Sequence, residues 1–169
     1  LRTQWFASHR IPLPPQGTDP ELGFVAGPTS GTFTLADCGR NLGLYALRRG
    51  FSVGFKITPT SSNMNGTILT LGHIVLSVAG DVWTVTTEAT TQSVTFAYSP
   101  GVQLILMAAA GVEGDSYISV GIQGGASNSA HDNIHVEPDN KFYYNSPVVT
   151  GTFGSIAVDA FRLAPFKYR

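Results

Sequence analysis

The chain has 169 residues, of which 12% are charged, and ten basic against eleven acidic side chains give a formal net charge of −1. This near balance removes the positive field that binding to nucleic acid or to an anionic membrane surface requires, so neither partner is expected. No stretch reaches the roughly 20 apolar residues of a membrane-spanning helix, and the length suits one domain with a core of its own. The single cysteine, Cys38, excludes an internal disulfide and any site built from several thiolates.

Residues 1–30 are predicted to form an extended N-terminal arm, and residues 31–169 a β-sandwich domain. Five of the ten prolines fall within the arm, where they block helix and favour extended chain. Apolar side chains such as Trp5, Phe6 and Phe24 predict that the arm packs on the domain or on a neighbouring subunit. The start at Leu1 rather than at a methionine is expected of a piece cut from a longer polypeptide.

From residue 31 onward, apolar and polar side chains alternate with the period of a half-buried β-strand. The clearest case is Phe51–Ile57, in which the apolar residues share one face with Lys56 on the other. Trp83 shares a face with Val85 and is expected in the core. The same alternation predicts strands at 51–57, 67–71, 74–78, 82–86 and 92–97.

The second half of the chain is predicted to continue the strands. Residues 102–107, extended towards 110, are apolar on both faces, which is typical of a central strand. A strand at 117–122 would place Ile122 on the buried face, and residues 124–147 are expected to form a long polar loop. Within 154–163 the apolar residues change phase, which predicts a β-bulge near Asp159. The chain is therefore expected to be all-β, with about ten to twelve strands and no helix.

Three stretches, in this order, resemble the concanavalin-A-like, laminin-G-type jelly rolls: 51–60, 67–85 and 154–163. The first is similar to that family's early core strand, the second to its consecutive middle strands, and the third to its closing strand, which returns beside the first. The resemblance implies a two-sheet antiparallel jelly-roll sandwich that binds glycans or proteins, as a module of adhesins, viral and phage fibres or extracellular enzymes. The Glu-x-Asp-x-x-Glu cluster of some glycosidases of this fold and the metal signature of legume lectins are absent from this sequence. The resemblance therefore implies neither catalysis nor a structural metal.

A polar loop followed by two tyrosines is the candidate ligand site. Sugar recognition uses an aromatic face for the CH-rich side of a pyranose, together with planar polar groups that make two hydrogen bonds at once. Adjacent strand residues point to opposite sides, so one of Tyr143 and Tyr144 is expected to face outward. An equally weighted alternative places one tyrosine in the core and the other at a strand edge. The candidate ligand-binding residues are His131, Asp132, Asn133, Tyr143, Tyr144 and Asn145.

The same loop does not predict a metal. Its carboxylates and asparagines lack the spacing of a calcium loop, and His131 and His135 lack a third zinc ligand. Glu113 and Asp115 flank Gly114 as residues of a solvated turn do. The sequence has neither a phosphate-cradling loop before a helix nor a nucleophile elbow, so we expect no cofactor and no enzymatic activity.

We therefore expect a non-enzymatic module that binds a glycan or a cell-surface receptor, at the C-terminal tip of a longer fibre or adhesin. Such a module would lie outside the cell or on the surface of a cell, virion or phage, and a homo-oligomer, in particular a trimer, is expected. Two alternatives stay open. One is an assembly domain without a small ligand, and the other is a glycoside hydrolase, which would need two carboxylates about 5 to 9.5 Å apart in an open groove.

Overall fold

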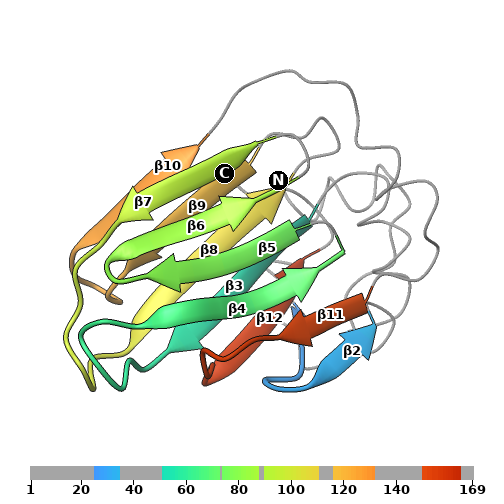
Figure 1. Cartoon of the computed structure of the whole chain (residues 1–169), viewed down its shortest axis with the longest axis horizontal. Coiled ribbons are helices and arrows are strands. Elements are labelled where there is room, and N and C mark those ends of the chain that lie inside the picture. The colour runs from blue at the N-terminus through green and yellow to red at the C-terminus, as the bar shows by residue number, and fades with distance from the viewer. Residues whose placement is uncertain are drawn as a thin grey trace.

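The computed structural model describes residues 25–34, 51–72, 74–87, 90–110, 116–131 and 150–164. These residues form two six-stranded antiparallel sheets, which we call sheet I and sheet II and which pack face to face. Sheet II lies towards the viewer in Figure 1. Sheet I has the order β1 (Val25–Ala26), β12 (Ala160–Ala164), β3 (Phe51–Ile57), β8 (Leu104–Ala110), β9 (Ser116–Gly121) and β10 (Ser127–His131). Sheet II has the order β2 (Thr32–Thr34), β11 (Thr150–Phe153), β4 (Asn65–Leu71), β5 (Ile74–Ala79), β6 (Val82–Thr86) and β7 (Thr91–Thr95). The predicted all-β, two-sheet antiparallel sandwich is confirmed, and no helix occurs among the described residues.

Most of the predicted strands are present where the alternation placed them. Phe51–Ile57 is strand β3, and β8 is an interior strand between β3 and β9, as its apolar run predicted. The closing strand β12 pairs with β3, with Phe161 opposite Phe55, and its other neighbour is β1. The last residues of the predicted arm thus contribute a short strand to sheet I. Residues 1–24 lie outside the described residues, so the boundary between arm and domain stays a prediction.

Three local expectations were wrong. Ile122 is 37% exposed, because it begins the turn to β10, in which Ile122 N–H donates to the carbonyl of Ala126. Residues 127–131 form strand β10 instead of loop. Their composition hid this strand, because an edge strand with a single apolar residue turned inward, Ala130, carries no hydrophobic alternation.

The third error concerns the change of phase before β12. The four apolar side chains are all buried, as predicted: Ile156, Val158, Phe161 and Leu163. The strand, however, begins only at Ala160, so the connection over 154–159 changes the phase instead of a bulge within a strand.

The core lies between the two sheets. One part is a cluster of four phenylalanine rings. The centroid of the Phe161 ring lies 5.4 Å from that of Phe33, 5.1 Å from that of Phe55 and 5.5 Å from that of Phe153. Trp83 is completely buried, and its Nε1–H donates to the carbonyl of Phe96 at 3.2 Å. The expectation of a core indole is confirmed, so Trp83 does not offer a stacking surface to a ligand.

Candidate functional site

Only one of the six predicted site residues lies within the described part of the chain. His131 is the last residue of β10, and its backbone pairs with Tyr117 of β9. Asp132, Asn133, Tyr143, Tyr144 and Asn145 lie outside the described residues, as do Cys38, Glu113, Asp115 and His135. The predicted loop site therefore stays a prediction. Its one described residue, His131, lies beside Tyr117 in the edge strand of sheet I.

The outward face of sheet I combines cationic, apolar and aromatic side chains. Because Val53, Phe55 and Ile57 point into the core, the intervening residues of β3 point outward. Register then places their neighbours on the same face: Gly54 lies between Arg162 of β12 and Met107 of β8, and Lys56 lies opposite Ile105. Lys56 and Arg162 are exposed, whereas Ile105, Met107, Ser119 and Tyr117 are half-buried.

Gly54 leaves a gap in this face. A Cβ atom built on Gly54 would have no heavy atom within 4 Å, although long side chains stand on both neighbouring strands. The backbone at Gly54 is therefore not covered by a side chain, while Arg162 and Met107 occupy the paired positions on the neighbouring strands and Lys56 the next outward position of β3. We call these four residues the Gly54 patch. At the far end of the same face Ser52 and Ala109 are buried, so the open part of the face is the part around Gly54.

The sequence alone does not reveal this arrangement, because its members are far apart in the chain. Arg162 and Gly54 are more than 100 positions apart and meet only through the pairing of β12 with β3. A signal was nevertheless present in the alternation of Phe51–Ile57, which already assigned Gly54 and Lys56 to the solvent side. What was missing was the strand order that places Met107 and Arg162 on either side of them.

The outward face of sheet II is different in chemistry. None of its six strands contains a charged residue. The outward positions are largely hydroxyl-bearing: Thr32, Thr34, Thr67, Thr70, Ser77, Thr84, Thr86, Thr91, Ser93, Thr95, Thr150 and Thr152. Some of these hydroxyls bond to one another, as Thr84 Oγ1 and Ser93 Oγ do at 2.8 Å. Neighbouring hydroxyls that satisfy each other make a neutral face without a strong recognition group.

Asp159 lies at one end of the sandwich, where β12 begins. Its Oδ2 atom accepts hydrogen bonds from Thr58 Oγ1 at 2.6 Å and from Gln103 Nε2 at 3.0 Å, and its N–H donates to the Lys56 carbonyl at 2.7 Å. The bond from Thr58, and then the bond from Gln103, lower the pKa of the Asp159 carboxyl below its ordinary value of 3.8. Asp159 thereby ties the starts of β8 and β12 to the end of β3, which is a structural role.

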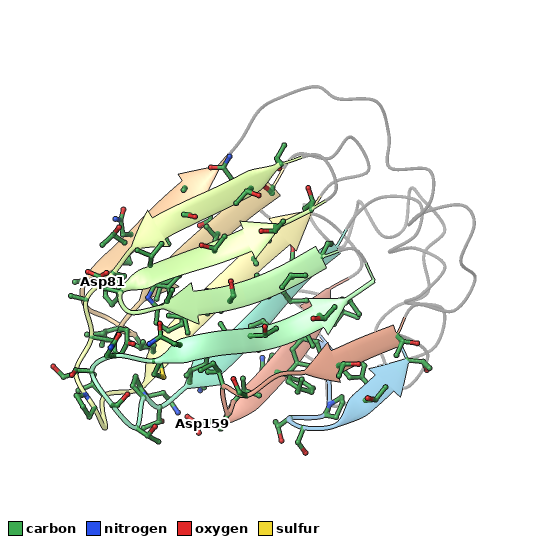
Figure 2. All side chains as sticks on the ribbon, viewed as in Figure 1. Asp81 and Asp159 are labelled. Carbon is green, nitrogen blue, oxygen red and sulfur yellow. The ribbon has the colours of Figure 1, made fainter. Side chains whose placement is uncertain are left out.

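Carboxylates do not converge in the described part of the chain. Asp81 and Asp159 are its only carboxylate side chains, and Figure 2 shows them apart from each other. No group of three or more His, Cys, Asp or Glu side chains suited to a metal ion occurs among the described residues. The same residues contain no helix long and apolar enough to cross a membrane.

Comparisons with known proteins identify similar structures and no similar sequence. No family model and no curated protein matches the chain. Solved structures that match include botulinum neurotoxin type C, whose passage into cells depends on interaction with two ganglioside molecules, at 14% identity and a TM-score of 0.51. The match covers 86% of this chain and 39% of that one.

Two further matches are structures of the binding domain of botulinum neurotoxin DC. The one in complex with rat synaptotagmin II is 16% identical with a TM-score of 0.50, and the one in complex with SialylT is 14% identical with a TM-score of 0.51. They cover 86% of this chain and 40% and 39%, respectively, of the neurotoxin chains. This chain thus spans about 40% of the length of the solved structures that it matches, and the likeness is one of fold.

Proposed function

We propose that this chain is a non-enzymatic recognition module that binds a glycan or a cell-surface receptor through the outward face of sheet I. The Gly54 patch is the observation that carries the proposal. It combines uncovered backbone at Gly54 with a guanidinium, an ammonium and a thioether on the same face, and Tyr117 lies on that face as well. A sugar ring needs such a mixture, because it presents CH groups and hydroxyls together.

The charges on this face indicate the class of glycan. Lys56 and Arg162 give this face two positive charges, and both side chains are exposed. A glycan that carries a carboxylate is therefore the expected ligand, since a guanidinium can bind that group with two parallel hydrogen bonds. The similar neurotoxin structures, which include complexes with SialylT and synaptotagmin II, support a receptor-binding use of this fold.

The predicted loop and context belong to the same proposal. Asp132, Asn133, Tyr143, Tyr144 and Asn145 would extend the binding surface from His131, which pairs with Tyr117 of the same sheet. The module would act outside the cell, at the tip of a fibre or adhesin. If the loop takes part, Tyr143→Ala or Tyr144→Ala should weaken binding by about 1 to 3 kcal/mol with little change in melting temperature. Unchanged affinity in both variants would remove the loop from the site.

A glycan array with matched variants tests the proposal. The full chain is applied to sialylated, desialylated and neutral glycans, together with Gly54→Val and Ser77→Val. Valine at Gly54 covers the open backbone of the Gly54 patch in a strand that accepts β-branched residues, whereas Ser77→Val makes the same kind of change on the neutral face. Gly54→Val should weaken binding at least about tenfold, or about 1.4 kcal/mol, and Ser77→Val should leave it unchanged. Silence of the unmodified chain on every glycan and on receptor-bearing cells would contradict the proposal and favour an assembly domain.

A further inference from the structure

The outward residues of sheet I form two rows that run across the strands. Residues that are paired between neighbouring strands lie on the same face, so the register defines which outward side chains stand side by side. From β12 to β10, the first row is Arg162, Gly54, Met107, Ser119 and Ser129. Over the same five strands, the second row is Ala160, Lys56, Ile105, Gly121 and Ser127.

Both rows change their chemistry in the same order. The two cations, Arg162 and Lys56, are exposed on β12 and β3, which we call the cationic side. Met107 and Ile105 follow on β8 as a half-buried apolar middle. The serines lie on β9 and β10, the hydroxyl side, and β8, β9 and β10 contain no lysine, arginine, aspartate or glutamate. A ligand that fits this face therefore needs a charge at one end only.

The hydroxyls of the hydroxyl side differ from those on sheet II. Ser119 lies opposite Ser129, and neither hydroxyl makes a hydrogen bond with another described residue. On sheet II, by contrast, neighbouring hydroxyls bond to each other, as in the pair of Thr84 with Ser93. A serine hydroxyl can both donate and accept a hydrogen bond. The hydroxyl side therefore keeps groups that can bond to the hydroxyls of a sugar.

We infer that sheet I binds a neutral oligosaccharide that ends in one acidic sugar, with the acid at the cationic side and the neutral sugars across the strands towards Ser129. The inference rests on the proposed function and adds the class and orientation of the ligand. Charge complementarity selects this occupant, because Arg162 and Lys56 are the only lysine and arginine side chains in the described part of the chain. The CH groups and hydroxyls of neutral sugars suit the apolar middle and the hydroxyl side.

The same arrangement disfavours two other acidic ligands. In a chain with an acid on every sugar, carboxylates would lie on Met107 and Ile105, where they would lose water without gaining a cation. A free acidic monosaccharide is too small, because neighbouring strands lie about 4.8 Å apart and Arg162 is therefore about 19 Å from Ser129 along the row. It can reach the cationic side but not the hydroxyl side.

Titration calorimetry of the full chain tests the inference with four probes. These are the singly sialylated oligosaccharide that binds best on the glycan array, its desialylated form, free sialic acid, and tetragalacturonic acid, which carries a carboxylate on every sugar. The singly sialylated probe should bind at least about tenfold more tightly than each of the others.

The outcomes separate this inference from the proposed function. Equal or tighter binding of any of the other three probes would overturn the inference and leave the proposed function in place. Binding on the array by neutral or polyacidic glycans, without any singly sialylated one, would do the same. Silence on every glycan and on receptor-bearing cells would overturn both.

An added charge tests the orientation. Ser129→Lys places an ammonium on the hydroxyl side, so this variant should bind tetragalacturonic acid at least about tenfold more tightly than the unmodified chain does. Ser77→Lys, which adds the same charge on sheet II, is the matched control and should show no such gain. Circular dichroism verifies that both variants are folded. No gain in Ser129→Lys, or an equal gain in Ser77→Lys, would contradict the orientation.

Removal of a charge tests the cationic side. Lys56→Gln should weaken binding of the sialylated probe at least about fivefold more than binding of its desialylated form, because only the first carries a carboxylate. Equal losses for the two probes would mean that the acid does not lie at Lys56 and would overturn the inference.

Discussion

The two outward faces of the sandwich arise from the same alternation of side chains but present different chemistry. On sheet I, β3 places a glycine and a lysine outward, and the neighbouring strands add Arg162 and Met107. On sheet II, the strands place threonine and serine outward, with no charged residue. One fold can thus carry a surface with groups for recognition and a neutral surface, because the inward residues alone determine the core.

Removal of a core ring that both sheets share should give the largest loss of stability, because this ring supports both faces. Phe161 is 2% exposed and contacts the rings of Phe33, Phe55 and Phe153, which come from both sheets. Phe161→Ala should lower the free energy of unfolding by about 3 to 5 kcal/mol, because the surrounding rings cannot close the cavity. Urea denaturation measures the change. A loss below about 1 kcal/mol would mean that the two sheets do not share this cluster.

Two strand glycines should respond in opposite ways to alanine. A Cβ at Gly151 of β11 would overlap the ring of Phe33, so Gly151→Ala should destabilise the chain by about 1 to 3 kcal/mol. A Cβ at Gly54 meets open space, so Gly54→Ala should raise stability by about 0.5 to 1 kcal/mol, because alanine loses less chain entropy than glycine in a strand. Thermal melting of the two variants side by side checks the contrast. Equal losses would show that neighbouring groups enclose Gly54 and would contradict the open backbone of the Gly54 patch.

Asp159 should give the smallest effect, and one that depends on pH. The pKa of its carboxyl is lowered in the folded chain by Thr58 and Gln103, so its contribution to stability is complete above the ordinary value of 3.8. The contribution should disappear as the pH falls through the lowered pKa. It should stay below about 1 kcal/mol, because the carboxylate is exposed and solvent screens it.

Asp159→Asn is the variant for this prediction. It should lose a little stability at neutral pH and show a flatter dependence of the unfolding free energy on acid than the unmodified chain. The measurement is urea denaturation at a series of pH values between about 2 and 6, the range around an aspartate pKa. Parallel curves for the two proteins would mean that the bonds from Thr58 and Gln103 do not hold the ionised carboxyl in solution.

The sequence was sufficient for the fold wherever one face of a strand is apolar, and insufficient elsewhere. The alternation in Phe51–Ile57 predicts β3 to the residue, whereas Ser127–His131 has almost no apolar residue and its polar composition predicts a loop. The Gly54 patch could not be predicted, because single-strand patterns do not specify which strands are neighbours. The binding role of Tyr143 and Tyr144 follows from local sequence alone and stays a prediction.

The most direct test of the central claim is chemical-shift mapping of the isotope-labelled chain with the glycan selected on the array. The account predicts that the amide signals of Gly54, Met107 and Ser119 shift as ligand is added, while those of Ser77 and Thr84 on sheet II remain in place. Shifts confined to sheet II, or no shift at Gly54 at saturating ligand, would contradict the assignment of binding to the outward face of sheet I.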